Sequence, residues 1–291
     1  MKTSISIVSG PSSQVLAGRV ARTLGCHLAD TEFSTFPDGE RYLRVPDIDS
    51  CDHVVIVQST PTDSDYISLL QLIDACDTSD RIDVVIPYFG YARQDKRFKD
   101  GESVSARALA HAITADHVFT VNIHNPGVLS YFGTPATSIN AAPAVGEYIA
   151  SMKLTDPMII APDEGAIDLV RSTSENLGVG FDYMEKTRIS GEEVSIKTKE
   201  PDVSGRDVVI LDDIISTGGT IVETTLLLKE NGVKRVFAAC IHPVLAQSAV
   251  LRIFAAGVEG IIATDTLDRS VSVVTVAQLI ANIFEGETIK Q

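Results

Sequence analysis

Short apolar runs rich in β-branched residues alternate along this chain with stretches in which apolar residues recur every three or four positions. The runs, which are typical of strands buried on both faces of a sheet, lie at Ile5–Val8, Val54–Val57, Val84–Pro87, Val118–Ile123, Met158–Ala161 and Val208–Leu211. The helical stretches lie at Gln14–Leu24, Asp63–Cys76, Ser103–Ile113, Ala144–Ser151, Ala166–Leu177 and Ile221–Lys229. This alternation predicts an α/β fold in which mainly parallel sheets are flanked by helices.

The pattern of the first half occurs again in the second half. An offset of 153 places Ile7 on Ile160, and an offset of 154 places Arg81 on Arg235. Offsets that agree this closely predict a duplicated α/β unit. Between the halves the pattern loosens into Gly, Pro, Thr, Ser and Ala at Thr134–Pro143, and we expect the domain boundary there.

Length and composition agree with two globular domains. The chain has 291 residues, of which 44% are hydrophobic and 22% are charged, so we expect an N-terminal domain at 1–141 and a C-terminal domain at 142–291. The four cysteines show no C-x-x-C spacing, which predicts neither a zinc site nor a redox pair. No signal-like core follows Met1, and no apolar run approaches the length of a membrane span, so we expect a cytoplasmic protein.

The net charge is −15, from 24 basic and 39 acidic residues. A field of this sign opposes nucleic-acid backbones and anionic membranes, so we expect neither as a partner. A phosphorylated ligand would therefore need a local group of basic residues or a metal ion.

One segment combines the end of an expected strand, a polar turn and the start of an expected helix. It carries two carboxylates, three hydroxyls and two glycines, at Asp212, Asp213, Ser216, Thr217, Thr220, Gly218 and Gly219. The glycines allow close approach of the backbone to a ligand, and the hydroxyls and helix N–H groups can surround a phosphate. The carboxylates suit sugar hydroxyls or a hydrated Mg²⁺. The segment predicts a site for a phosphorylated sugar; the alternative is an Asp-rich turn with a helix cap.

The first half has diverged at the corresponding position. It has Gln58–Pro61 without a glycine pair, so we expect the sugar-phosphate loop in the second half. A different segment of the first half, Tyr88–Glu102, concentrates basic and aromatic residues directly after an expected strand. Such a segment suits a nucleotide, because aromatic rings stack on a base while Arg and Lys face phosphates. The alternative is a solvated surface loop.

The sequence alone leaves the roles of three further features undecided. Phe33–Glu40 contains a Pro-Asp-Gly turn beside an aromatic residue, which predicts a hairpin or a strand-to-loop turn. His124 is either a metal or phosphate ligand or a loop residue bonded to the backbone. Lys186 and Arg188 occupy alternate positions and would point the same way in an extended chain, so they predict a lid over a polyphosphate.

Together, four motifs resemble those of the ribose-phosphate pyrophosphokinases: Phe36–Glu40, Tyr91–Asp95, Glu185–Arg188 and Asp212–Thr220. The last motif alone is shared with type I phosphoribosyltransferases, whereas the combination is far more specific. The resemblance implies two duplicated type I phosphoribosyltransferase-like domains. It also implies transfer of the β,γ-diphosphoryl group of ATP to the anomeric hydroxyl of ribose 5-phosphate, with Mg²⁺ as cofactor.

The resemblance also implies a role for each matching residue. The expected ATP contacts are Phe36, Asp38, Gly39, Glu40, Arg93 and Gln94. Phe36 to Glu40 would come from a neighbouring subunit, so a homo-oligomer is expected. The expected Mg²⁺ contacts are His124 and Asp163, and the expected catalytic residues are Lys186 and Arg188. The expected ribose 5-phosphate contacts are Arg188, Asp212, Asp213, Ser216, Thr217, Gly218, Gly219 and Thr220.

Two other function classes compete with this expectation. A type I phosphoribosyltransferase would consume phosphoribosyl pyrophosphate, but such an enzyme needs a single unit and not the motifs of the first half. A catalytically silent regulatory relative would bind ligands without turnover. The presence of Lys186, Arg188, His124 and Asp163 argues against that class.

Overall fold

The computed structural model describes the chain except residues 1–4, 47, 49–50, 189–193, 198–201 and 289–291, and it leaves the side chains of 185–188, 194–197 and 286–288 undescribed. The chain divides into two compact units. The first unit comprises Met1–Asn140, Thr266–Asp268 and Thr275–Gln291, and the second comprises Ala141–Asp265 and Arg269–Val274.

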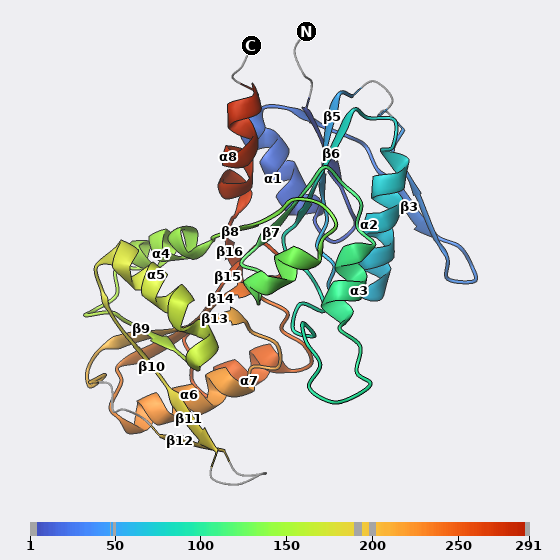
Figure 1. Ribbon diagram of the computed structural model, residues 1–291. Helices are drawn as coiled ribbons and strands as arrows, with labels where there is room; N and C mark the ends of the chain where they lie inside the picture. Colours follow the sequence, from blue (N-terminus) through green and yellow to red (C-terminus); the bar gives the residue numbers. More distant parts are fainter. Residues whose placement is uncertain (1–4, 47, 49–50, 189–193, 198–201, 289–291) are drawn as a thin grey trace. The chain divides into compact units, whose positions relative to one another are not determined.

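The first unit contains a six-stranded sheet in which all neighbouring strands are parallel. Its strands, in spatial order, are β2 (His27–Leu28), β1 (Ile5–Ser9), β5 (His53–Val57), β6 (Arg81–Ile86), β7 (His117–Val121) and β8 (Ala136–Ile139). Its helices are α1 (Gln14–Leu24), α2 (Asp63–Ala75), α3 (Ser105–His111) and α8 (Ala277–Thr288), with the 3₁₀ helix η1 (Pro126–Tyr131). In Figure 1, α1 and α8 lie on one face of the sheet, and α2 and α3 lie on the other.

The second unit repeats this arrangement. Its strands, in spatial order, are β10 (Gly180–Tyr183), β9 (Met158–Ala161), β13 (Asp207–Ile214), β14 (Arg235–His242), β15 (Gly260–Thr264) and β16 (Ser272–Val274). Its helices are α4 (Ala142–Ser151), α5 (Ile167–Leu177), α6 (Gly219–Glu230) and α7 (Ala249–Ala255), with the 3₁₀ helix η2 (Glu164–Ala166). β5 and β13 hold the same place in their sheets, which agrees with the duplication expected from the sequence. The ligand crevice of such sheets lies at the carboxyl ends of the strands, where the strand order reverses.

The division into units differs from the expected domains in one respect. The change at Asn140 and Ala141 lies within one residue of the expected boundary, but the C-terminal segment returns to the first unit. Its helix α8 packs there through Phe284, whose ring centroid lies 6.0 Å from that of His53 and 5.6 Å from that of Phe119. Several elements also differ from the expected ones. All elements from β14 to α8 follow Lys229, where we expected none from the sequence. β8 lies in the segment expected to be loose, and β13 extends through Asp212 and Asp213.

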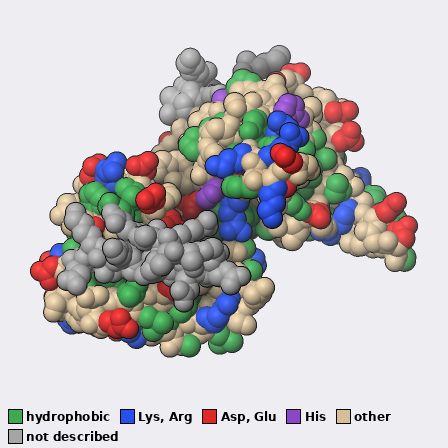
Figure 2. Space-filling model, turned by 60° about the horizontal axis from the view of Figure 1, so that its bottom comes forward, with side chains coloured by type: hydrophobic (Ala, Val, Ile, Leu, Met, Phe, Trp, Pro, Cys, Tyr) green, Lys and Arg blue, Asp and Glu red, His purple; other side chains and the backbone are tan. Residues whose placement is uncertain are grey.

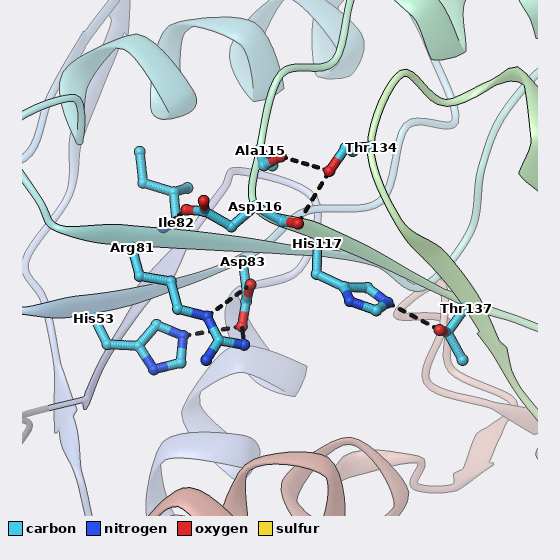
Figure 3. Close-up of polar contacts among 9 residues, drawn as sticks. All are labelled: His53, Arg81, Ile82, Asp83, Ala115, Asp116, His117, Thr134 and Thr137. Atoms are coloured by element: carbon cyan, nitrogen blue, oxygen red, sulfur yellow. Dashed lines mark hydrogen bonds and ion pairs between the residues drawn. The ribbon is translucent and has the colours of Figure 1, made fainter.

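Each sheet carries an arginine–carboxylate pair at the amino end of its strands. In the first unit, Arg81 Nη2 lies 2.7 Å from Asp83 Oδ2, and His53 Nε2 lies 3.0 Å from the same oxygen (Figure 3). Burial raises the pKa of Asp83, but hydrogen bonds from His53 and Arg81 outweigh burial and lower it below its usual value. In the second unit, Arg235 Nη2 lies 2.5 Å from Asp207 Oδ2. Both pairs lie at the edge of the sheet opposite to the ligand crevice.

Candidate active site

The predicted sugar-phosphate segment begins inside β13. The Asp213 N–H donates to Asp212 Oδ1 at 2.8 Å. Burial, together with the neighbouring carboxylates of Asp213 and Asp163, raises the pKa of Asp212 to about 8. Crowded carboxyl groups of this kind favour a proton, a cation or sugar hydroxyl donors as partners. The site therefore suits a polyhydroxylated ligand and a divalent cation.

The turn between β13 and α6 leaves room for a ligand. Gly218, the residue before α6, has φ 78°, and a Cβ on it would lie 3.0 Å from the Ile253 side chain. A Cβ on Gly219 would meet only Thr217 Oγ1 at 4.0 Å, and both Gly219 and Thr217 are exposed. Packing thus requires glycine at 218, whereas 219 is open to solvent at the start of a helix, where N–H groups favour an anion.

The loop between β14 and α7, together with α7 itself, donates hydrogen bonds to the backbone carbonyls of this turn. Leu245 N donates to the Ile215 carbonyl at 2.9 Å, and Ala246 N donates to the Ser216 carbonyl at 3.0 Å. Arg252 Nη2 donates to the Thr217 carbonyl at 2.6 Å. We did not predict these supporting residues, and their local sequence carries no signal for them.

The first unit closes the corresponding position with its own side chains. Gln58, Ser59 and Thr60 follow β5 and are buried. Gln58 Oε1 accepts from Ser12 N at 3.2 Å, and the Ser59 N–H donates to Ser13 Oγ at 2.9 Å. A phosphate loop requires open N–H groups, and these polar groups are already satisfied within the chain.

The basic segment of the first unit contains a pocket of about 370 Å³, which is lined by Gln94, Lys96, Phe98, Glu102 and Ser103. Lys96 Nζ lies 5.4 Å from the centroid of the Phe98 ring, and Phe98 is 68% exposed. Ser105 Oγ donates to Gln94 Oε1 at 2.6 Å, which leaves the Gln94 amide group to donate. Arg93 is exposed. In the view of Figure 2, several Lys and Arg side chains lie close together in the upper part, despite the net charge of −15.

The predicted turn at Phe36 to Glu40 is the end of a hairpin formed by β3 (Glu32–Thr35) and β4 (Arg41–Arg44), which extends away from the first sheet (Figure 1). The Phe36 ring packs edge-on against Tyr42, with ring centroids 6.0 Å apart. The Glu40 N–H donates to Asp38 Oδ1 at 3.3 Å. All four predicted ATP contacts of this turn, including Gly39, are exposed.

The two predicted metal contacts belong to different units. His124 follows β7 in the first unit and is exposed. Asp163 follows β9 in the second unit, and its Oδ1 accepts from the Gly165 N–H at 3.0 Å. Within the described residues, no three His, Cys, Asp or Glu side chains gather as a metal site. Mg²⁺ usually takes one or two carboxylates together with substrate phosphates and water, so the crowded carboxyls around Asp212 fit it.

The predicted lid residues lie on a second hairpin. β11 (Glu185–Arg188) pairs with β12 (Val194–Lys197) in an antiparallel ladder, and Lys186 and Arg188 occupy alternate positions of β11. Their side chains lie outside the described part of the chain, so their expected closure over phosphates stays a prediction. Along the described helices, none is long and apolar enough to cross a membrane.

The second unit has a parallel sheet with paired carboxylates and a Thr-Gly-Gly-Thr turn at its carboxyl edge, and the first unit repeats this strand order with the corresponding turn closed. Together they define a duplicated phosphoribosyltransferase fold. Residues 5–116 match the N-terminal domain of ribose phosphate pyrophosphokinase, and residues 129–260 match the phosphoribosyl transferase domain. The chain belongs to the ribose-phosphate pyrophosphokinase family.

Individual relatives agree with this membership. The ribose-phosphate pyrophosphokinase of Methanosarcina acetivorans is 54% identical over 95% of this chain and 98% of its own length. That of Methanosarcina mazei is 52% identical over 97% and 96%, respectively. The crystal structure of phosphoribosylpyrophosphate synthetase from Mycobacterium smegmatis has a TM-score of 0.84, at 28% identity over 97% of this chain and 98% of that one. The family and the fold expected from the motifs are thereby confirmed.

Proposed function

We propose that the chain is a ribose-phosphate diphosphokinase, a transferase that converts ATP and ribose 5-phosphate to AMP and phosphoribosyl pyrophosphate. The anomeric oxygen of ribose 5-phosphate attacks the β-phosphorus of ATP. The bond from that phosphorus to the α,β-bridging oxygen breaks, and AMP leaves with the electron pair. The hydroxyl proton passes to solvent or to a basic group. Two observations carry this proposal: the open sugar-phosphate turn of the second unit and the pocket within the basic segment of the first unit.

The second unit binds ribose 5-phosphate in this proposal. Its 5-phosphate lies at the N-terminus of α6, against the backbone and hydroxyls of Ser216, Thr217, Gly218, Gly219 and Thr220. The carboxyl groups of Asp212 and Asp213 accept hydrogen bonds from the ribose hydroxyls. The open space at Gly219 and the exposure of Thr217 support this assignment, because a helix N-terminus with open N–H groups favours an anion.

The first unit binds ATP in this proposal. Arg93 faces the phosphates, and Gln94 donates its amide hydrogens because Ser105 occupies its oxygen. A neighbouring copy of the chain supplies Phe36, Asp38, Gly39 and Glu40, so the enzyme acts as a homo-oligomer with a shared site. The 49% exposure of Phe36 at the end of a projecting hairpin supports this arrangement, since exposed aromatic rings are common at binding surfaces.

Mg²⁺ is the cofactor in this proposal, with His124 and Asp163 as its protein contacts. When bound, it neutralises charge on the transferring phosphoryl groups and fixes their orientation. Lys186 and Arg188 supply further positive charge where negative charge develops, and Arg188 also contacts ribose 5-phosphate. We place the enzyme in the cytoplasm, where ATP and sugar phosphates are made.

The product pattern distinguishes this proposal from its alternatives. Incubation with ATP, Mg²⁺ and ribose 5-phosphate should release AMP. A type I phosphoribosyltransferase would instead release pyrophosphate from phosphoribosyl pyrophosphate in the presence of a nucleobase. A silent relative would bind both substrates without releasing AMP at any pH or with any divalent metal tested, and that result would refute the proposal.

A further inference from the structure

Tyr91 has a backbone conformation that is uncommon for a residue with a side chain. Its φ is 63°, in the left-handed region where Cβ crowds the following carbonyl oxygen, so surrounding contacts must maintain it. The residue before it, Gly90, packs closely against the loop that follows β5. A Cβ on Gly90 would lie 2.0 Å from the Thr60 carbonyl oxygen. The backbone therefore contacts that loop closely, directly before the left-handed residue Tyr91.

Hydrogen bonds connect this turn to the loop and to the helix after β5. Tyr91 Oη donates to Asp63 Oδ1 at 2.5 Å, and Asp63 is the first residue of α2. The Gly90 N–H donates to Thr60 Oγ1 at 3.0 Å, and the Thr60 N–H donates to the Tyr88 carbonyl at 2.9 Å. The hydrogen bond and the charge of Asp63 raise the pKa of the Tyr91 hydroxyl. The hydroxyl therefore remains the donor in this contact.

The turn at Tyr91 sets the direction of the two residues assigned to ATP. Ala92 is buried at 6% exposure, whereas Arg93 and Gln94 are exposed. The Gln94 N–H donates to the Tyr91 carbonyl at 2.8 Å, which closes the turn. A rotation of the backbone at Tyr91 would redirect Arg93 and Gln94 together.

We propose that Tyr91 and Asp63 are positioning residues for the nucleotide, which act by fixing the backbone that carries Arg93 and Gln94. The loop after β5 has the same position in the first sheet as the sugar-phosphate turn has in the second sheet. Its polar groups, however, form hydrogen bonds within the first unit. In this role it serves as a support for the ATP-binding segment. The inference rests on the proposed function, because it assumes that Arg93 and Gln94 contact ATP.

Steady-state kinetics of the full chain test this inference. Tyr91→Phe keeps the ring and the backbone but removes the donor, and Asp63→Asn removes the charge of the acceptor. Each should raise the KM for ATP about three- to tenfold, the range expected from one lost hydrogen bond, with the KM for ribose 5-phosphate within twofold. The double variant should be no worse than the more affected single variant, because both changes remove the same contact. Tyr148→Phe, a hydroxyl removal on α4 in the second unit, is the matched control and should change neither constant.

Arg93→Ala separates failure of this inference from failure of the proposed function. If Arg93→Ala raises the KM for ATP while Tyr91→Phe leaves it within twofold of the unaltered chain, the positioning role is refuted and the nucleotide role stands. If Arg93→Ala leaves the KM for ATP unchanged, the nucleotide role of Arg93 and the positioning role of Tyr91 are both refuted. The proposed function itself fails only if the unaltered chain releases no AMP. Equal changes in both KM values, together with a lower melting temperature, would make the contact structural and would also refute the positioning role.

Discussion

Arg252 on α7 donates from Nη2 to the backbone carbonyl of Thr217 at 2.6 Å. The contact joins an exposed side chain to the turn that we assign to ribose 5-phosphate. The hydrogen bond is made to the backbone of Thr217 and not to its side chain, so the turn is supported through its backbone. A support of this kind can orient N–H groups toward a ligand without contacting the ligand.

The first prediction concerns this support. Arg252→Gln should raise the KM for ribose 5-phosphate about three- to tenfold, because the turn loses a hydrogen bond worth about 1 kcal/mol. The KM for ATP should change less than twofold. Arg171→Gln, which removes an exposed arginine of α5 paired with Asp168, is the control and should leave both constants unchanged. Parallel changes in both KM values would contradict a specific role of Arg252 in the sugar-phosphate turn.

The second prediction compares the two adjacent glycines. Gly218→Ala should lower stability by about 2 kcal/mol, because alanine is strained at a positive φ and would meet Ile253. Gly219→Ala should leave the melting temperature nearly unchanged, since its Cβ meets open space, but it should weaken ribose 5-phosphate binding by filling that space. Differential scanning fluorimetry and equilibrium binding measure the two effects. Unchanged ribose 5-phosphate affinity in Gly219→Ala would contradict the assignment of the open space to a ligand.

The third prediction concerns acid sensitivity. The hydrogen bond from Arg235 holds the pKa of Asp207 below its usual value. A carboxyl with a lowered pKa contributes stability above its unfolded pKa of about 3.9, and this contribution is lost as the pH falls through the folded value. Asp207→Asn should therefore cost about 2–3 kcal/mol at pH 7, and its difference from the unaltered chain should shrink below about pH 4.

Urea unfolding at several pH values measures this difference. Asp168→Asn is the control, because its pair with Arg171 is exposed and worth less than about 1 kcal/mol. A difference between Asp207→Asn and the unaltered chain that stays constant from pH 7 to pH 3 would show that the ionised form of Asp207 is not the stabilising one.

The fourth prediction concerns the lid. Lys186→Ala should lower kcat by about 10²–10³, the usual loss when a group that stabilises developing charge is removed, with ribose 5-phosphate affinity within a few-fold. Thr187→Ala lies between the two basic residues on β11 and should retain turnover, because neighbouring positions of a strand alternate between faces. Equal losses of turnover and sugar-phosphate affinity in Lys186→Ala would assign Lys186 to ground-state binding.

Much of the fold could be predicted because most strands are buried on both faces and so read as apolar runs. β8 escaped prediction because Ala136–Ile139 is half-exposed and mixes small polar with apolar residues. The return of α8 to the first unit involves contacts such as that between Phe284 and His53, which lie far apart in the sequence. No local pattern encodes such a contact.

The candidate site also has one part that could be predicted from the sequence and one part that could not. The sugar-phosphate turn, the basic segment and the hairpin were recognisable because each combines its chemistry within a short stretch of sequence. The supports of that chemistry were not recognisable. Arg252 reaches Thr217 across the sequence, and Leu245 and Gln247 adopt φ values of 47° and 56° without the glycine that would signal a left-handed turn. These conformations are set by tertiary packing, which overrides local propensity.

The central claim is that this chain transfers an intact diphosphoryl group from ATP to the anomeric oxygen of ribose 5-phosphate. The most direct measurement is a time course with ATP labelled with ³²P at the β-phosphorus, in the presence of Mg²⁺ and ribose 5-phosphate, with products separated by chromatography. We expect label in phosphoribosyl pyrophosphate, formed in a one-to-one ratio with unlabelled AMP and dependent on ribose 5-phosphate. Formation of labelled ADP, or absence of AMP while both substrates bind, would contradict it.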